Sequence, residues 1–311
     1  MITLNSEKGL ISVENWDDIT SRPGFVANLN PREHTLKAVI GQYQFKEKIP
    51  CGLSNCHTPH NKGYIVSTEG GAETNIGKDC GRAYFGIEFE NHARKYERDL
   101  ADYENRLALH RFSFQIETIR ELVHELRSGE RGGDWCYKVA QPLHASNRGV
   151  PEIISRKIGA MLKAQQRVLS ISRQATAAET EALEAVEGRP VPRPHTIEDP
   201  IAEIRGLDAL DPENNLKQLL VLKIEEIKEF EGKEIDSMSS KELRQWAKWA
   251  DTFDEALEKA QTAIVAHRAL LTPENLEPFR RLLSNYSDIA NFDAYLGRLT
   301  EPRGIPSGSR S

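Results

Sequence analysis

The chain has 311 residues, 39% of them hydrophobic and 28% charged, and its formal net charge is −6. This length suits two domains, or one elongated helical body with a small appendage, and the composition allows a modest core. Four cysteines, three of them clustered, argue against a disulfide framework. Neither a signal-like start nor an apolar run of membrane length is present in the sequence, so we expect a cytoplasmic protein.

The first hundred residues predict the β structure of the chain. Residues 1–30 carry only scattered apolar positions, and we expect irregular structure there. β-Branched and aromatic residues over 36–45 predict a strand. Residues 64–66 and 74–76 flank a Glu-Gly-Gly turn at 69–71 and predict a hairpin, after which we expect no further sheet.

The stretch from Cys51 to Cys80 also contains Cys56, His57 and His60. Zinc binds four thiolate or imidazole ligands at tetrahedral angles, and ligands on either side of a hairpin supply them with little loss of chain entropy. We therefore expect Zn bound by Cys51, Cys56, His60 and Cys80. His57 is the alternative to His60, although a residue adjacent to Cys56 must bend its side chain sharply to reach the same ion.

The run Asn75-Ile76-Gly77-Lys78-Asp79-Cys80 resembles the end of small treble-clef-like zinc fingers found in uncharacterised bacterial and phage proteins. In those fingers a Cys pair precedes a hairpin, and an Ile/Val-Gly-x-x-Cys element places the last thiolate at a helix N-terminus. The resemblance covers about thirty residues and implies no activity. Because Ala83 is not a ligand, the fourth contact is expected from a histidine. The helix N-terminus should favour the thiolate of Cys80.

Other interpretations of the same stretch stay open. The Cys-x4-Cys-His sequence at 51–57 matches a wide c-type haem attachment motif, which needs an export signal and leaves Cys80 without a role. An HNH-type nuclease would use His34, Asn55 and His57, although Asn55 lies closer to His57 than that motif requires. Buried reduced cysteines with surface histidines are the simplest alternative.

Beyond Cys80 the apolar residues change to a repeat of about 3.5 residues, from Phe89 to Phe114. This spacing predicts a long helix packed lengthwise against another helix. The following residues, 129–150, are rich in glycine and predict an irregular loop. Cys136 and His144 in that loop are further metal candidates, although a buried free thiol is the simpler interpretation of Cys136.

A basic middle segment suggests nucleic acid as a partner. Residues 111–180 carry 11 Lys and Arg against 7 Asp and Glu. We expect a helix after Pro151 that continues to Leu169 and places its cations on one face. Such a stripe can follow a phosphate backbone, although a solvated helix surface explains it as well. The predicted nucleic-acid-binding residues are Arg156, Lys163, Arg167, Lys138 and Arg148.

These patterns predict a mainly α fold, with a zinc-braced β-hairpin head followed by long helical hairpins or a coiled-coil-like bundle. The predicted parts are a zinc-binding α+β head (1–86), a helical hairpin (87–186) with the loop 129–150, a Pro-rich linker (187–200), a helical bundle (201–300) and a flexible tail (301–311).

No catalytic arrangement emerges from the sequence, which has no phosphate-binding glycine loop and no recognisable Ser/His/Asp set. We expect a non-catalytic zinc-binding adaptor or scaffold that acts through helical contacts with a protein partner or with a second copy. The first alternative is a DNA- or RNA-binding protein that uses the zinc head and residues 111–180. The second is an HNH-like metal-dependent nuclease.

Overall fold

The computed structural model describes residues 2–6, 9–144 and 149–300, which fold mainly as helices with a sheet near the N-terminus, as predicted. The chain forms two compact units. The first contains Met1–Ser113 and Glu234–Ala250, and the second contains Phe114–Lys233 and Asp251–Ser311. The predicted tail, 301–311, lies outside the described residues.

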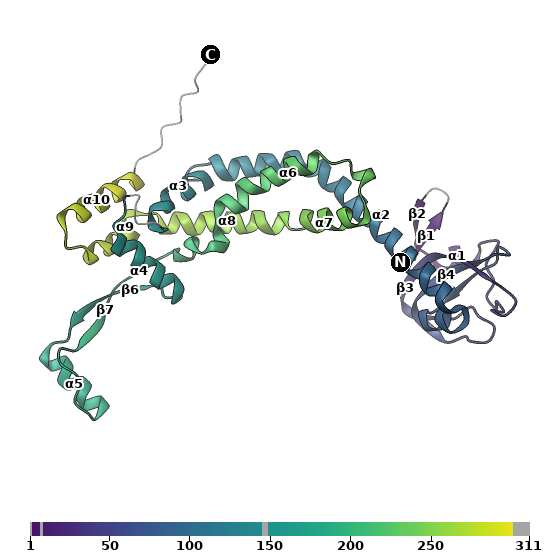
Figure 1. Ribbon diagram of the computed structural model, residues 1–311, viewed down its shortest axis with the longest axis horizontal. Coiled ribbons are helices and arrows are strands. Elements are labelled where there is room, and N and C mark those ends of the chain that lie inside the picture. The colour runs from purple at the N-terminus through teal and green to yellow at the C-terminus, as the bar shows by residue number, and fades with distance from the viewer. Residues whose placement is uncertain (1, 7–8, 145–148, 301–311) are drawn as a thin grey trace, which may run out of the picture. The chain divides into compact units, whose positions relative to one another are not determined.

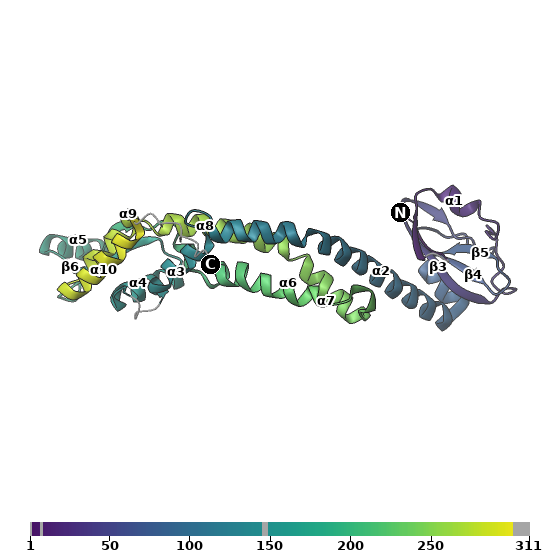
Figure 2. The same cartoon turned by 90° about the horizontal axis from the view of Figure 1, so that it is seen from above.

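The first unit is built on an antiparallel sheet of five strands in the order β2-β1-β3-β4-β5 (Figure 2). The strands are β1 (Ile2–Ser6), β2 (Gly9–Val13), β3 (Leu36–Pro50), β4 (Pro59–Thr68) and β5 (Glu73–Ile76). The predicted strand and hairpin are confirmed, with Tyr64 opposite Ile76. The prediction of irregular structure over 1–30 is wrong, because this segment forms β1, β2 and the short helix α1 (Trp16–Thr20).

Each face of the sheet has its own apolar cluster, because successive side chains of a strand point to opposite faces. In β4, Tyr64 and Val66 join a cluster that includes Phe89. Ile65, between them, packs in a second cluster with Tyr43. Both faces are therefore covered, which explains the unbroken burial of β4 from Gly63 to Val66.

Helix α2 (Lys78–Ser128) starts with a short segment that carries Cys80 and then turns at Gly86, whose φ of 60° and ψ of −139° are not helical. After the turn, Phe89 packs back onto Gly81, where an added Cβ would lie 2.4 Å from the phenyl ring. The same ring makes an edge contact with Tyr64, at 5.5 Å between centroids. Phe89 therefore fixes the first turn of α2 against the sheet.

The helical part of the first unit is completed by η4 (Ile235–Ser237) and α7 (Ser240–Ala250). Glu242 accepts hydrogen bonds from the backbone and hydroxyl of Ser239, and its own backbone N–H donates to that hydroxyl, so the residues capping α7 pair reciprocally. Trp249 of α7 makes an edge contact with Phe112 of α2, at 5.1 Å between centroids.

The second unit is mostly helical (Figure 1). Its helices are α3 (Gly133–His144), α4 (Glu152–Lys163), α5 (Ala177–Glu187), α6 (Lys223–Glu231), α8 (Phe253–Leu270), α9 (Pro273–Leu276) and α10 (Tyr286–Thr300). Short 3-10 segments are η1 (Leu207–Leu210), η2 (Pro212–Asn214) and η5 (Glu277–Leu282), and η3 (Lys217–Leu222) is a π-helix.

The irregular loop predicted over 129–150 is wrong, because α3 occupies most of it. The buried side chains of α3 include Trp135, Cys136, Ala140 and Leu143, whose spacing places them on one face of a helix. Burial of this apolar face stabilises the helix, despite the flanking glycines and the internal Pro142.

A second, two-stranded sheet lies where a helix and a linker were predicted (Figure 1). Helix α4 ends at Lys163, and β6 (Val168–Gln174) takes the residues expected to continue it. Its partner β7 (Thr196–Glu203) includes the end of the predicted Pro-rich linker. The expectation of a single sheet is therefore wrong, and the β-branched residues Val168 and Ile171 agree with the observed strand.

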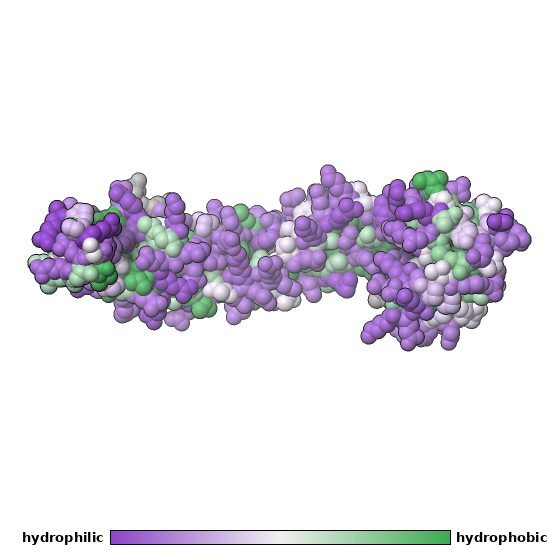
Figure 3. Space-filling view, turned by 90° about the horizontal axis from the view of Figure 1, so that it is seen from below, coloured by the Kyte–Doolittle hydropathy of each residue, from purple (hydrophilic) through white to green (hydrophobic). Residues whose placement is uncertain are grey.

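The surface in Figure 3 is largely hydrophilic, with hydrophobic residues in separate small patches. Among the described residues, no helix combines the length and the hydropathy needed to cross a membrane.

Candidate metal centre

Three of the predicted zinc ligands converge in the first unit. Cys51 follows the last residue of β3, Cys56 lies in the connection to β4, and Cys80 lies in the first turn of α2. Pairing of Pro50 with Pro59 closes the connection that carries Cys51 and Cys56. The three Sγ atoms lie within 4.8 Å of one another, so the expected three-cysteine cluster that can hold a metal ion is confirmed.

The distances among these sulfur atoms suit a shared ion. Two thiolates at about 2.3 Å from zinc and at a tetrahedral angle are separated by roughly 3.8 Å. The Sγ atoms of Cys56 and Cys80 are 3.2 Å apart, which is too far for the S–S bond of about 2.0 Å in a disulfide. All three cysteines are free thiols, and their spacing is near what a tetrahedral cation requires.

The cluster is part of the hydrophobic core of the first unit. Cys51 is fully buried, and Cys56 and Cys80 pack at the edge of the cluster that contains Leu53 and Phe89. A backbone hydrogen bond closes the β3–β4 connection, because the Cys51 N–H donates to the Thr58 carbonyl at 3.2 Å. Core packing and backbone hydrogen bonds therefore position the three thiols without the help of an ion.

The three thiols have different acidities. Burial raises the pKa of Cys51, and burial together with a hydrogen bond to Cys56 raises the pKa of Cys80 to about 12. For Cys56 burial acts in the same direction, but hydrogen bonds from Thr58 and from the other thiols outweigh it and lower the pKa. For Cys80, burial and the neighbouring sulfur oppose the preference for the thiolate that is expected at a helix N-terminus.

His60, the predicted fourth ligand, does not join the group of sulfur atoms. Its Nδ1 lies 3.0 Å from the Thr58 carbonyl, which can only accept, so Nδ1 carries the proton. Nε2 then accepts from the Tyr43 hydroxyl at 2.5 Å. Asn75 donates to the same hydroxyl at 3.2 Å and to the Pro50 carbonyl at 2.9 Å. Both ring nitrogens of His60 are therefore engaged.

His57, the alternative ligand, also lies outside the sulfur group but has a free nitrogen. Its Nδ1 is 3.3 Å from the Cys51 carbonyl, so Nδ1 is the protonated nitrogen and Nε2 keeps its lone pair. Among the described residues, nothing bonds to Nε2. The residue has a φ of 52°, which is uncommon for a side chain other than glycine. The turn thus holds an exposed imidazole directly beside Cys56.

The other metal candidates do not assemble. Within the part of the chain that the structure describes, the three cysteines form the one group of three or more metal-ligating side chains. His34 and His57 therefore join no metal group of the HNH kind. Cys136 is buried in α3, where its thiol donates to the Arg131 carbonyl at 3.3 Å, and His144 lies at the end of the same helix.

The predicted nucleic-acid-binding residues lie in the second unit. Arg156 pairs with Glu152 one turn earlier on α4, at 2.6 Å, and Lys163 is the last residue of that helix. Arg167 lies beyond the end of α4, so the expected three-cation stripe along one helix is wrong. Lys138 is exposed on α3. Arg148 lies outside the described residues.

Sequence reasoning missed Tyr43 and Asn75 as parts of the site. Both are buried, and together they connect the ring of His60 to the end of β3. A buried amide position within the predicted strand 74–76 gave no clear signal for Asn75, because Glu73 and Thr74 beside it are polar as well. The side chain of Tyr43 gave no signal either, because aromatic residues are common in strands.

Comparison with known proteins gives no assignment. No protein family matches the sequence, and neither a curated protein nor a solved structure shows significant similarity to it.

Proposed function

We propose that the chain is a non-catalytic, zinc-binding adaptor, in which zinc braces the first unit and the helices bind a protein partner. The observation that carries this proposal is the convergence of the Sγ atoms of Cys51, Cys56 and Cys80 within 4.8 Å, where the β3–β4 connection meets α2. A single cation there ties three segments of the chain together. It would add stability to a sheet whose apolar clusters are small.

Zinc fits this donor set better than harder cations do. Thiolates are soft ligands that favour zinc and similar ions, whereas calcium and magnesium require oxygen ligands. Binding also requires the thiols of Cys51 and Cys80 to lose their protons, which a divalent charge promotes. Burial is the main reason that the pKa values of Cys51 and Cys80 are raised, and a bound cation would offset that cost of burying the thiolates.

We assign the fourth position to His57, through a movement of its turn that keeps the contact with the Cys51 carbonyl and brings Nε2 toward the sulfur atoms. Imidazole ligands of metals usually donate their second ring N–H to a carbonyl, and His57 makes such a contact with the Cys51 carbonyl. His60 would have to give up its bond from Tyr43 to bind the ion. Zinc with four protein ligands is the closed arrangement of structural sites, whereas catalytic zinc keeps a position for water or substrate.

Exposed apolar residues of α2 support the adaptor role. In the first unit, Tyr103 and Leu107 are exposed one turn apart on this helix. In the second unit, the side chain of Phe114 is 86% exposed. Large apolar residues on a helix surface are typical of helix–helix contacts between proteins. We propose that α2 pairs with a helix of a protein partner, and a second copy of the chain is the first partner to test.

Cobalt substitution tests the metal part of this proposal. We expect one Co²⁺ per chain, with the visible absorption of a tetrahedral thiolate site. His57→Ala should change this spectrum and weaken binding by roughly tenfold or more, because one ligand is lost. His60→Ala, a matched change three residues away, should leave the spectrum unchanged. A wild-type chain that binds no metal would rule out the adaptor as proposed.

Light scattering tests the partner part. A mass near twice 35.1 kDa at high concentration is expected, and Phe114→Ser should weaken self-association by about ten- to a hundredfold, the value of burying one aromatic side chain. Gln115→Ser, at an exposed neighbouring position on α2, is the control. A monomer that is retained on DNA or RNA in a salt-sensitive way would instead support the nucleic-acid alternative, which stays a prediction.

A further inference from the structure

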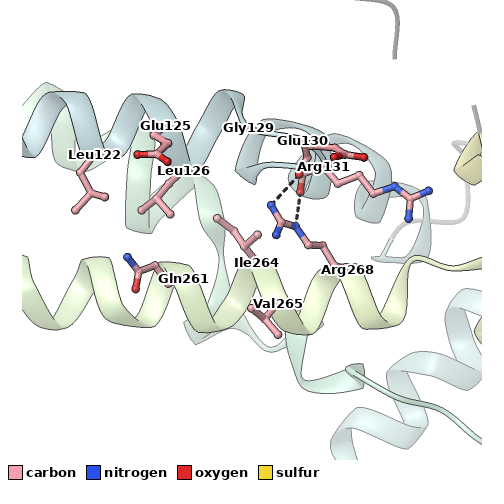
Figure 4. A pocket seen from close by; sticks show the side chains of 10 residues that line it. All are labelled: Leu122, Glu125, Leu126, Gly129, Glu130, Arg131, Gln261, Ile264, Val265 and Arg268. Atoms are coloured by element: carbon pink, nitrogen blue, oxygen red, sulfur yellow. Dashed lines mark hydrogen bonds between the residues drawn. The ribbon is translucent and has the colours of Figure 1, made fainter. Parts of the chain in front are cut away.

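Two of the cavities in the second unit differ in how far their polar groups are engaged. The larger one, about 680 Å³, lies between α8 and the last turns of α2 (Figure 4). Its Arg268 donates to the Glu130 and Arg131 carbonyls at 2.8 and 3.1 Å. Glu125 and Gln261 at its wall are exposed to solvent. This cavity is an open groove whose charged groups have partners or water.

The smaller cavity, about 390 Å³, is lined by residues of α3, η1, η2 and α8 and is partly open to solvent. Its apolar wall is formed by Ala140, Leu210 and Leu216, which are buried. A cavity of this size falls in the range of about 300–1,000 Å³ that small-molecule sites occupy, with apolar walls and a few polar groups. The polar groups therefore decide what it can hold.

His267 of α8 presents an unpaired acceptor to this cavity. The residue is 4% exposed. Its Nδ1 lies 2.7 Å from the Ala263 carbonyl, which can only accept, so Nδ1 carries the proton and Nε2 has a lone pair. The described part of the chain gives Nε2 no hydrogen-bond partner. Among the described residues, Nε2 of His267 is not one of the fully buried side-chain atoms that lack a partner, so it is accessible and can accept from water or from a molecule in the cavity.

Three further polar groups line the same cavity. The Tyr137 hydroxyl, the His144 ring and the Asp211 carboxylate have no hydrogen bond or ion pair among the described residues. Burial lowers the pKa of both His144 and His267, which favours their neutral rings, each with one acceptor nitrogen. The described lining contains no lysine or arginine. The cavity is therefore rich in acceptors and carries a negative charge.

The backbone at the rim is unusual. Leu216 is followed directly by the π-helix η3, Lys217–Leu222. Segments of π-helix are rare and less favourable than α-helix, and they are frequently found at functional sites. The π-helix η3 therefore begins directly after Leu216, a residue that lines the cavity. It is a second feature, independent of His267, that marks this region.

We propose that this cavity binds a small organic cation with N–H donors, of the amine, amidine or guanidine class. Its donors bond to Nε2 of His267 and to the Asp211 carboxylate. Its apolar part packs against Leu210 and Leu216. The site is separate from the cysteine cluster, because all of its residues belong to the second unit.

Calorimetry with benzamidine and its neutral analogue benzamide tests this proposal on the full chain. Benzamidine should bind roughly tenfold more tightly than benzamide, because a charged donor pairs with a carboxylate. Asp211→Asn should remove that preference while both compounds still bind. Glu255→Gln, which changes an exposed carboxylate of α8 outside the cavity, should leave the preference intact.

Nitrogen NMR of labelled histidine locates the binding. The Nε2 resonance of His267 should report an unprotonated nitrogen in the free protein and should shift when benzamidine is added. Because His267 is buried, its replacement by Leu would also disturb the packing of the unit, so Asp211→Asn carries the mutational test. The proposal is overturned if benzamidine does not bind, or if it binds wild type and Asp211→Asn equally. It is also overturned if Zn²⁺ displaces benzamidine from the Cys80→Ser variant, because zinc would then bind in the cavity itself.

Discussion

The cysteine cluster of the first unit and the histidine cavity of the second unit differ in how their polar groups face one another. In the cluster, three sulfur atoms lie within 4.8 Å and contact each other directly. In the cavity, His267, His144 and Asp211 surround about 390 Å³ of space. Ligands that converge on a point suit a single ion, whereas ligands around a volume suit a molecule.

The two sites also differ in how the chain assembles them. Cys51, Cys56 and Cys80 come from thirty consecutive residues on a hairpin and the helix that follows it. The cavity combines α3 with α8, more than a hundred residues apart in sequence. The cluster therefore depends on local backbone structure, and the cavity depends on how the helices of the second unit pack.

The largest expected effect is the loss of the metal on replacing Cys80 by Ser. Removing one thiolate should reduce bound zinc from one per chain to less than about a tenth, because structural zinc sites bind through all their ligands together. The first unit should then lose amide protection in β4 and β5, while most of the helical dichroism remains. Elemental analysis and hydrogen exchange measure the two effects.

Cys136→Ser is the matched control for this change. Cys136 is buried in α3 of the second unit, and its thiol donates to a backbone carbonyl and does not belong to the cluster. It should keep a full complement of zinc. If Cys136→Ser lost as much zinc as Cys80→Ser, the assignment of the ion to the first unit would be wrong.

A smaller effect is expected at the corner that positions Cys80. Gly81→Ala places a methyl group 2.4 Å from the ring of Phe89, so the ring or the first turn of α2 must move. Overpacking of this kind costs about 1–3 kcal/mol, and the displaced turn should weaken metal binding as well. Urea unfolding and zinc competition measure the two losses.

Gly159→Ala tests whether the loss at Gly81 is due to crowding. Gly159 lies within α4, and an added Cβ there meets no atom within 4 Å. Alanine favours helix over glycine by up to about 1 kcal/mol, so this variant should be slightly more stable than wild type. Equal destabilisation by both substitutions would show that the packing of Phe89 is not the cause.

A third prediction separates the hydrogen-bond network from the metal. Tyr43→Phe removes the hydroxyl that bonds to Nε2 of His60 and accepts from Asn75. Leaving these buried groups short of a partner should cost about 1–3 kcal/mol. The cobalt spectrum should not change, because neither group is a ligand in our assignment. A spectral change would make His60 a ligand and would remove His57 from that role.

The sequence was sufficient to predict the cluster because its ligands are close together in the chain. Cysteines are rare, and Cys51, Cys56 and Cys80 around a predicted hairpin leave few alternatives to a shared ion. The choice of histidine was not predictable, because it depends on the proton positions of two rings. The carbonyls of Cys51 and Thr58 fix those positions, and only the fold shows them.

The cavity was not predictable for a related reason. His267 follows the apolar spacing of its helix and gives no sign of a free nitrogen. His144 was expected in a loop that is in fact the end of α3. Proline and glycine in that segment outweighed the helical spacing of Trp135, Ala140 and Leu143, although burial of that face decides the structure.

The smallest expected effect is a pH dependence that originates in the cavity. Burial lowers the pKa of His267 below its ordinary value of 6.5 in the folded chain. The unfolded chain then takes up a proton at a higher pH than the folded chain does. Stability that comes from the neutral ring is therefore complete above pH 6.5 and is lost as the pH falls through the folded-state pKa.

Comparing wild type with His267→Gln isolates this contribution, because glutamine keeps polar atoms but does not titrate. The stability difference between the two chains, measured by urea unfolding, should shrink as the pH is lowered from 7 through 6.5 and below. Groups that face His267 in both chains, namely His144, Asp208, Asp211 and Tyr137, cancel in the difference. Benzamidine should oppose the loss in wild type, because a donor at Nε2 competes with the proton. A difference that stays constant with pH would mean that Nε2 is not a free acceptor, and the cavity would lose the feature that distinguishes it from the open groove.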